Sequence, residues 1–299
     1  VQAQIDRMAR EGRLPEPASI DFIRWVHGEF YKDVPKEMLF IRGRNTEFIM
    51  SPGEWRSSMN EDVAVGRHIP PSSDRIPDYM AYFQARYRFS GLGMAGKIMN
   101  MAAAHHRFNY IHPFPDGNGR VSRLMSHSMA HVSGIGAHGL WSISRGLARG
   151  LKSRTEYKSM MDRADTPRQG DFDGRGNLST RALIEFIHWF LSVCLDQIQF
   201  MSSLFEIDTL AVRLRKYVDQ HDTLKPEAIR LLEEALVRGE FQRGEIARIS
   251  GLPERSARRV LSELEAIGLL ASITPKGPVS LRFPPDVAEI LFPRLFPEI

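Results

Sequence analysis

Cysteine is almost absent from this sequence. Its 299 residues include one, Cys194, so no disulfide can form within the chain and a disulfide-stapled scaffold is excluded. The segment around it, WFLSVCLDQI, is apolar, which predicts a buried free thiol and not a nucleophile. We therefore expect a protein of a reducing compartment, the cytoplasm.

Long apolar runs are also missing. No stretch reaches the length that crosses a bilayer, and the basic start VQAQIDRMAR has neither the apolar centre nor the cleavage site of a signal peptide. We expect no membrane partner and no export by that route. Because the chain starts at Val1 and not at Met, we also expect further residues upstream.

Neither sign of charge dominates. Lys and Arg number 40 against 36 for Asp and Glu, a formal charge of +4. This balance is compatible with binding nucleic acid but does not require it. With 42% apolar residues, the chain can bury one large core and a smaller second one.

The apolar residues that are present follow helical spacing. They predict helices over residues 21–31, 77–89, 93–111, 120–132 and 179–205, the last capped by Ser179. Between the first two, Val63 and Val65 alternate among Gly and Pro breakers, which predicts a short hairpin. The fold class is therefore mainly α.

After about Gln220 the pattern of the sequence changes from long apolar helices to short, charged helical stretches. Three short charged helical stretches (226–237, 244–252 and 253–270) precede a strand-like segment with a Pro-Gly turn (271–283). This is the order of a winged helix-turn-helix domain. We place the boundary near residues 215–222 and expect domains at 1–218 and 219–299.

A glycine-rich turn, HPFPDGNGRVSR at residues 112–123, joins two of the predicted helices. Gly117 and Gly119 allow close approach of the backbone to an anion at a helix N-terminus, where N–H groups lack partners. Asp116 supplies a carboxylate of the kind that Mg²⁺ prefers. His112 precedes the turn, where it can accept a proton from an attacking hydroxyl.

Two arginines complete this turn. Arg120 and Arg123 are three residues apart, so their guanidinium groups lie on one helix face and can meet the same polyphosphate. A base, a metal ligand, an anion cradle and a cationic clamp in one turn favour phosphoryl chemistry. The pattern GxxxxGK[ST] and the strand, GxGxxG, helix order are both absent, which argues against a Walker-type loop and a dinucleotide fold.

The turn resembles the signature of the Fic family, HxFx[DE]GNGRxxR, at each defining position. PGEWRSS and IPPSSDRIPDYM resemble the family's target-docking flap, and AAAHHRFNYIHPF resembles the helix before its active loop. The resemblance spans roughly residues 20–200. It implies a Fic helical-bundle fold with a core at about 20–205, a β-hairpin flap at about 60–72 and, as often in this family, an appended winged helix.

The resemblance also implies an activity, protein adenylylation: transfer of AMP from ATP to a Ser, Thr or Tyr hydroxyl of a target protein. His112 would be the general base, Asp116 would bind Mg²⁺ on the nucleotide phosphates, and Phe114 would anchor the loop. The implied phosphate-binding groups are Gly117, Asn118 with its backbone and its side chain, Gly119, Arg120 and Arg123.

The implied flap comprises Gly66, Arg67, His68, Ile69 and Pro70. An extended target segment would add main-chain hydrogen bonds to it and so present its hydroxyl to the base. A plain surface hairpin fits the same residues equally well. Fic-like sites that remove AMP or transfer another phosphate-bearing group also remain alternatives.

A further alternative is a DNA-binding regulator whose Fic site only senses nucleotide. Its candidate DNA contacts are Arg255, Ser256, Arg258 and Arg259 in the second helix of the C-terminal domain, with Lys276 in the wing. Neighbouring glutamates at 254, 263 and 265 dilute the positive field. We therefore favour a winged helix that serves target docking or homodimerisation over one that binds DNA.

Two minor features are less specific. Many Fic proteins carry an inhibitory helix with the pattern [ST]xxxE[GN]; the nearest string, RMAREG at 7–12, has Arg7 at the Ser or Thr position and Glu11 at the Glu position. Four histidines flank the turn. His105 and His106 precede it, and His127 and His131, one helical turn apart, follow it; without a recognisable third ligand, all four are interpreted as packing or surface residues.

Overall fold

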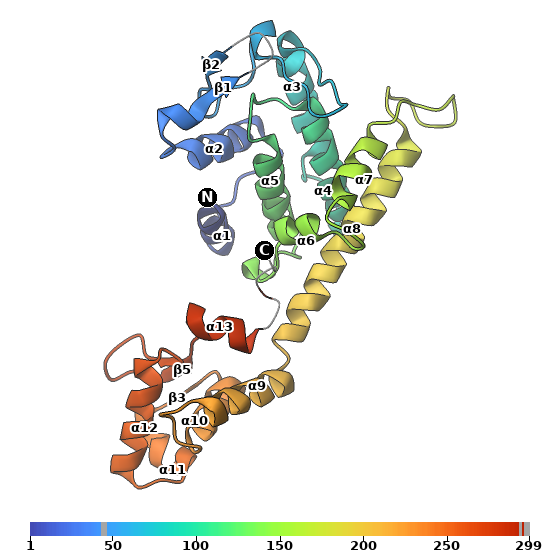
Figure 1. Cartoon of the computed structure of the whole chain (residues 1–299). Coiled ribbons are helices and arrows are strands. Elements are labelled where there is room, and N and C mark those ends of the chain that lie inside the picture. The colour runs from blue at the N-terminus through green and yellow to red at the C-terminus, as the bar shows by residue number, and fades with distance from the viewer. Residues whose placement is uncertain (43–46, 293–294, 296–299) are drawn as a thin grey trace. The chain divides into compact units, whose positions relative to one another are not determined.

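The computed structural model describes residues 1–42, 47–292 and 295. Helices dominate it, with two small antiparallel sheets (Figure 1). The chain divides into two compact units, Val1–Gln199 and Phe200–Ile299. Among the described helices, none has the length and apolar character needed to cross a membrane.

The first unit is a bundle of helices with one small sheet. Its helices are α1 (Gln2–Arg10), α2 (Ile20–Tyr31), α3 (Ile76–Tyr87), α4 (Met94–Ile111), α5 (Asn118–Val132), α6 (Ile143–Arg149), α7 (Glu156–Ala164) and most of α8 (Thr180–Leu204). The strands β1 (Phe40–Arg42) and β2 (Glu47–Ile49) pair antiparallel, with Phe40 opposite Ile49. Short 3₁₀ turns connect several of these elements.

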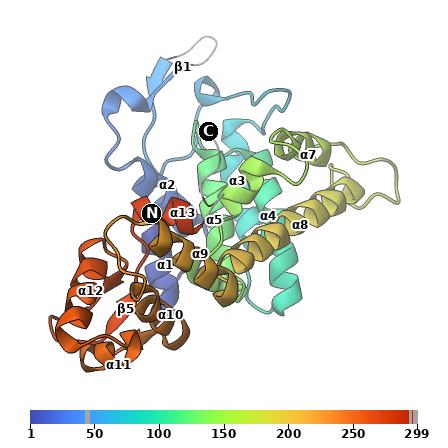
Figure 2. The ribbon, with the colours of Figure 1, turned by 60° about the horizontal axis from the view of Figure 1, so that its bottom comes forward.

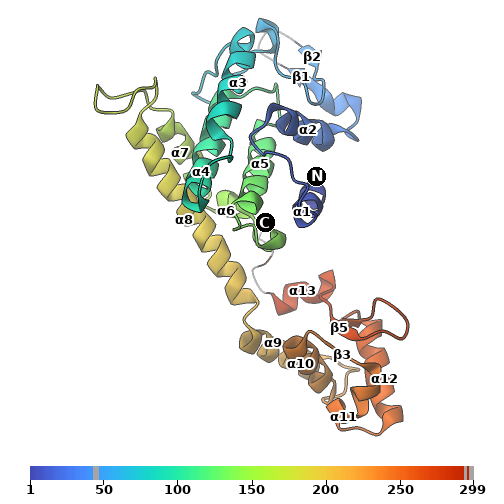
Figure 3. The same ribbon diagram turned by 180° about the vertical axis from the view of Figure 1, so that it is seen from behind.

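The core of this unit lies around α4 and α5. These two helices pack against each other, α3 packs against α4, and α2 packs against α5 (Figures 2 and 3). On α4 the small residues Ala102 and Ala104 and the large Phe108 are fully buried. On α5, Val121 and Met125 are fully buried as well. Small side chains on α4 allow the close approach of α5, and burial of apolar area drives it.

The main helices agree with the sequence pattern. The mainly α fold class is confirmed, and α2, α3, α4, α5 and α8 lie where helical spacing predicts them. Ser179 caps α8, because its Oγ accepts the Ala182 N–H at 3.1 Å. Cys194 is buried in α8, and burial raises the pKa of its thiol to about 12, as expected for an inert cysteine.

The predicted hairpin around Val63 and Val65 is largely wrong. The structure has one isolated bridge there, between Val65 and His68, whereas the two-stranded sheet lies earlier, at β1 and β2. Proline and glycine breakers are frequent between Val63 and Pro71, and proline has no N–H for a longer ladder.

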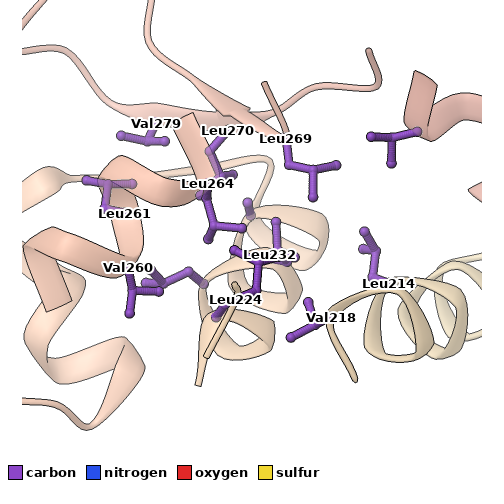
Figure 4. Close-up of a cluster of buried hydrophobic side chains, with 14 of the residues drawn as sticks. Leu214, Val218, Leu224, Leu232, Val260, Leu261, Leu264, Leu269, Leu270 and Val279 are labelled. Atoms are coloured by element: carbon purple, nitrogen blue, oxygen red, sulfur yellow. The ribbon is translucent and has the colours of Figure 1, made fainter. Parts of the chain in front are cut away.

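The second unit has its own sheet and core. Its elements are α9 (Ile207–Gln220), α10 (Ala228–Arg238), β3 (Glu240–Phe241), α11 (Ile246–Ser250), α12 (Glu254–Ala266), β4 (Leu270–Ala271), β5 (Val279–Leu281) and α13 (Pro285–Leu291). The strands form an antiparallel sheet in the order β3-β5-β4. Figure 4 shows its core, with Leu232, Val260 and Leu264 meeting between the helices.

The boundary between the units differs from the predicted one at 218/219. It lies between Gln199 and Phe200, because α9 packs against α10 and α13 and so belongs to the second unit. Leu210, Leu214 and Val218 of α9 are buried in that unit's core. The winged-helix assignment of residues 219–299 stays a prediction.

Candidate active site

His112 ends α4 in an uncommon backbone conformation. Its φ of 50° and ψ of 58° place it in the left-handed region, which a residue with a side chain adopts only at some cost. Its N–H donates to the Phe108 carbonyl at 2.9 Å. Its ring Nδ1 lies 3.3 Å from the Asn109 carbonyl, an acceptor, so Nδ1 carries the proton. The other nitrogen, Nε2, is then left with its lone pair free to accept a proton.

The environment of His112 keeps its ring neutral. Burial lowers the pKa of the imidazole to about 4; the Asn109 carbonyl opposes this shift, and the nearby Arg56 guanidinium adds to it. A neutral imidazole with a free Nε2 is the form that a general base requires.

Phe114 anchors the loop that follows. Its side chain is fully buried and stacks on the ring of His27, with centroids 3.8 Å apart and planes 10° from parallel. The ring of Trp55 is a second neighbour of Phe114, with 4.6 Å between the two ring centroids. The predicted anchoring contact therefore exists, and it connects the loop to α2.

Asn118 turns its side chain into the loop. Its Oδ1 accepts the Phe114 N–H at 3.0 Å, and its Nδ2 donates to the Phe114 carbonyl at 2.7 Å. The residue is only 1% exposed. The expectation that this side chain helps to hold phosphates is therefore wrong, since both of its polar groups serve the loop backbone and little of it meets solvent.

His27 is a second clamp on the loop that the sequence pattern did not reveal. Its Nδ1 accepts the Gly53 N–H at 2.8 Å, so Nε2 carries the proton and donates to the Asp116 carbonyl at 3.2 Å. Burial lowers the pKa of His27 to about 4, against the opposing effect of Asp116. His27 thus holds the loop in place as a neutral ring.

The Asp116 carboxylate is exposed but oriented. Its Oδ2 accepts the Tyr31 hydroxyl at 2.7 Å and lies 3.3 Å from Nη1 of Arg120. Partial burial acts to raise the pKa of Asp116, but hydrogen bonds from Tyr31 and the Gly117 N–H and the charge of Arg120 outweigh it, and the pKa is lowered. An ionised carboxylate with 52% of its side chain exposed fits the donor chemistry of a Mg²⁺ site.

The first turn of α5 forms an open cradle. Gly117 has φ 80°, and a Cβ there would lie 2.8 Å from the Tyr31 ring, so only glycine fits. At Gly119 a Cβ would meet nothing within 4 Å. Among the described residues, the N–H groups of Asn118 and Gly119 have no acceptor. Two unpaired donors at a helix N-terminus, with open space beside Gly119, suit an anion.

The two arginines of the turn differ in their partners. Arg120 donates to the Tyr31 hydroxyl at 2.6 Å and pairs with Asp116. In the described part of the chain, Arg123 makes no hydrogen bond or ion pair. Its charge acts on buried His105, whose pKa falls to about 3, mainly through burial and then through Arg123. Arg123 is therefore the cation of the turn that is most available to a phosphate.

Arg56 connects the active loop to the segment that precedes α3. Its side chain is 1% exposed. Nε donates to the His112 carbonyl at 2.8 Å, Nη1 to Asp62 Oδ1 at 2.6 Å, and Nη2 to the Pro71 carbonyl at 2.6 Å. The stretch PGEWRSS resembles the Fic target-docking flap as a whole, but no pattern in the sequence distinguishes Arg56 from its neighbours.

Comparison with known proteins agrees with this geometry. The model of the Fic/DOC family matches residues 17–130, which include α2 to α4, most of α5 and the complete loop. The chain carries a Fic domain.

Curated relatives of this domain include the proteins named protein adenylyltransferase Fic from Aedes aegypti and Drosophila melanogaster. Each is 34% identical over 82 residues, which is 27% of this chain and 16% of the relative. The match therefore spans about a sixth of the length of these relatives.

Solved structures of Fic proteins are also similar. One is a Fic domain containing signaling protein from Bacteroides thetaiotaomicron, with 17% identity, a TM-score of 0.45 and coverage of 67% of each chain. Another is a Fic family protein from Desulfovibrio desulfuricans, with 15% identity, a TM-score of 0.44 and coverage of 93% of this chain and 72% of that chain.

The predicted flap of the Fic domain lies against the end of α4. Val65 and His68 exchange two main-chain hydrogen bonds of 3.0 Å around Gly66 and Arg67. His68 Nε2 lies 2.8 Å from the carbonyl of Tyr110, two residues before His112. Ile69 is 81% exposed, and Pro70 is buried. The segment is thus near the base, and its docking role stays a prediction.

Glu11 does not reach the Fic site. Its carboxylate pairs with Arg13, and its neighbours Arg10 and Gly12 line a cavity with His131 and the turn after α5. That is the opposite end of α5 from the phosphate cradle. The structure thus contradicts Glu11 as an inhibitor that pairs with Arg123.

In the second unit, two of the five candidate DNA contacts have ion-pair partners on their own helix. On α12, Arg258 pairs with Glu254, and Arg259 pairs with Glu263 at 2.9 Å. Arg255 is exposed, Ser256 is partly buried, and Lys276 is exposed in the turn between β4 and β5. These intrahelical ion pairs reduce the charge available to a phosphate backbone.

Proposed function

We propose that the Fic domain transfers AMP from ATP to a Ser, Thr or Tyr hydroxyl of a target protein, as the names of its curated relatives suggest. The observation that carries this proposal is the neutral His112 with a free Nε2, held on the same short loop as an open helix N-terminus. A base beside an anion cradle is the minimum that hydroxyl transfer to a phosphate needs.

In the reaction, Nε2 of His112 accepts the proton of the target hydroxyl. The hydroxyl oxygen attacks the α-phosphorus, and the bond from this phosphorus to the oxygen that bridges to the β-phosphorus breaks. Pyrophosphate leaves and AMP remains on the target. Because this direct attack forms no covalent bond to the enzyme, positioning and charge stabilisation provide most of the rate.

The phosphates would rest on the first turn of α5. Within the part of the chain that the structure describes, the N–H groups of Asn118 and Gly119 and the guanidinium of Arg123 lack partners that would compete for them. Arg120 would add a second positive charge from beside Tyr31. Asp116 would hold Mg²⁺, which when bound neutralises phosphate charge; Tyr31 keeps that carboxylate oriented and ionised.

Target docking is assigned to the segment Gly66–Pro70. Its position is fixed to the loop, because Arg56 bonds both His112 and Pro71. An extended target segment that pairs with this edge would lie near the base. The exposed Ile69 offers an apolar contact beside that edge.

The C-terminal unit is assigned as a winged helix that docks targets or a second copy of the chain. Its element order from α10 to β5 and its β4–β5 hairpin support the assignment. The paired arginines of α12 favour this role over DNA binding. The buried thiol of Cys194 supports a cytoplasmic location.

Labelled ATP tests the reaction. With cell lysate as the source of targets, we expect protein labelling from ATP labelled at the α-phosphate and none from ATP labelled at the γ-phosphate. His112→Ala should lower labelling by ~10²–10⁴-fold while ATP affinity stays within about twofold, because the base acts only when the hydroxyl attacks. Labelling from the γ-position, or loss of AMP from a modified protein in place of gain, would assign the site to a different reaction.

A further inference from the structure

Two histidines of α5 meet an aspartate of α1 away from the phosphate cradle. Asp6 Oδ1 lies 2.7 Å from Nε2 of His127 and 2.9 Å from Nε2 of His131. The two Nε2 atoms are 3.3 Å apart. Figures 1 and 3 show α1 beside α5, which brings these residues together from distant parts of the sequence. None of the three has a role in the proposed transfer reaction.

The three atoms form a triangle small enough to share one ion. Its corners lie about 1.7 Å from its centre, which is less than the ~2.0–2.1 Å of zinc bonds to imidazole nitrogen or carboxylate oxygen. An ion can therefore touch all three atoms from a point about 1 Å above their plane. Two imidazoles and one carboxylate are a ligand set that zinc and other first-row divalent ions accept, with at least one position left for water.

The three side chains of this cluster are largely shielded from solvent. The side chains of Asp6, His127 and His131 are 18%, 9% and 8% exposed. A Cβ at position 136 would lie 2.6 Å from Nδ1 of His131, and one at position 139 would lie 3.1 Å from Oδ2 of Asp6. Both positions are glycine, so the imidazole and the carboxylate have the room to converge.

A path to solvent exists beside the cluster. His131 lines a cavity of about 390 Å³ together with Arg10, Gly134 and Gly136. The cavity reaches one of the ligands, His131. A partly shielded three-ligand site beside such a cavity is typical of zinc sites that keep an open coordination position.

We propose that Asp6, His127 and His131 bind a divalent transition-metal ion, Zn²⁺ in the first instance, and that this ion ties α1 to α5. On binding, each imidazole offers the Nε2 lone pair and keeps its proton on Nδ1, so the ion replaces the hydrogen bonds to Asp6. Because the ligands come from two helices, binding stabilises the folded chain.

The test uses the untagged full chain, freed of metal and titrated with zinc chloride. We expect one equivalent of zinc per chain by calorimetry and elemental analysis, together with a rise in Tm. Asp6→Asn and His131→Gln should each weaken zinc binding by more than ~10-fold. The matched control is His188→Gln, an exposed histidine of α8, which should bind zinc like the wild type.

A second measurement does not depend on the variants folding. X-ray absorption at the zinc edge of the wild-type protein should show two imidazoles among nitrogen and oxygen ligands, and His112→Ala should leave this spectrum unchanged. Three results would overturn the proposal: no zinc binding by the wild-type protein, equal zinc binding by Asp6→Asn and the wild type, or a spectrum that changes in His112→Ala. The cluster would then be only a hydrogen-bonded contact between α1 and α5. Loss of zinc binding would leave the AMP transfer proposal intact, because the readouts are separate.

Discussion

At the scale of single residues, the tautomer of His112 determines what the loop can do. The Asn109 carbonyl fixes the proton on Nδ1, and the left-handed backbone at this position turns the chain from α4 into the loop. Strain of this kind persists where neighbouring contacts hold it in place. Here these contacts come from Arg56, which bonds the His112 carbonyl.

The pH dependence of transfer follows from this environment. The base works when the ring is neutral, so activity is lost as pH falls through the pKa of His112. Burial, together with Arg56, places that pKa at about 4 and not at the ordinary value of 6.5. We expect kcat/KM for AMP transfer to stay level from pH 8 to about pH 5 and to fall below that. A fall centred near pH 6.5 would contradict the assignment.

The two glycines of the loop should respond differently to the same substitution. In Gly117→Ala, the added Cβ meets Tyr31 and the backbone has φ 80°, so we expect the free energy of unfolding to fall by ~1–3 kcal/mol. In Gly119→Ala, the Cβ enters open space, and the fold should keep its stability. The same Cβ would occupy the approach of a phosphate, so ATP affinity should drop.

Urea unfolding and ATP calorimetry on the two glycine variants form one matched experiment. A stable Gly119→Ala variant with unchanged ATP affinity would remove the α5 N-terminus from the phosphate site. Equal stability of Gly117→Ala and the wild type would contradict the close Tyr31 contact.

Arg123 should contribute directly to nucleotide binding. In the described chain it makes no ion pair or hydrogen bond, and a phosphate would gain a charged partner there. We expect Arg123→Ala to weaken ATP binding by ~10-fold or more, which corresponds to ~1.5–3 kcal/mol for a hydrogen bond to a charged group. Calorimetry that gives the wild-type affinity would exclude it from the clamp.

At the scale of elements, the loop depends on segments that the sequence places far from it. Arg56 joins the end of α4 to the stretch from Asp62 to Pro71. Replacing it with methionine keeps the length of the side chain and removes its five N–H donors. We expect Arg56→Met to lose ~3 kcal/mol of stability, because Asp62 and three backbone carbonyls lose a buried partner. Urea unfolding checks this value, and a loss below ~1 kcal/mol would show that the bridge is dispensable.

The same variant should loosen the flap segment. Limited proteolysis should then cut between Ser57 and Pro71 faster than in the wild type. Arg24→Met is a suitable control, since Arg24 is a partly exposed arginine that bonds Gly53 and Glu54 outside the loop. Unchanged proteolysis in Arg56→Met would show that Arg56 does not hold the flap segment to the active loop.

How much the sequence predicts depends on the distance between partners along the chain. The residues of HPFPDGNGRVSR are adjacent, so their types and order alone predicted a phosphate turn between helices, and α4 and α5 lie on either side of it. His27, Tyr31 and Arg56 hold this turn from elsewhere, and no local spacing connects them to it. The Asn118 side chain was misassigned for a related reason, since its direction depends on the folded loop.

Long-range partners also explain the histidines of α5. His127 and His131 have the spacing of a helical metal site, but no third ligand lies near them in the sequence, so the pattern alone does not predict one. Asp6, on α1, supplies it in the folded protein. Helix α1 itself was not predicted as an element, because its charged residues leave Ile5 as its only buried residue.

At the scale of the whole molecule, the chain combines a Fic domain with a second unit that has a separate core. The exposed positive charge of α12 is partly paired within the helix. We therefore expect no sequence-selective binding to duplex DNA near physiological salt, measured by fluorescence anisotropy. Sequence-selective binding that survives in His112→Ala would favour a nucleotide-sensing DNA regulator over the proposed transferase.

The central claim is that His112 and the first turn of α5 together place AMP on a protein hydroxyl. Mass spectrometry of lysate proteins after incubation with this chain, ATP and Mg²⁺ tests it most directly. We predict a mass increase equal to one AMP moiety on Ser, Thr or Tyr side chains, present with the wild type and lost with His112→Ala. An increase equal to a single phosphate, or an AMP adduct that persists in His112→Ala, would contradict the account.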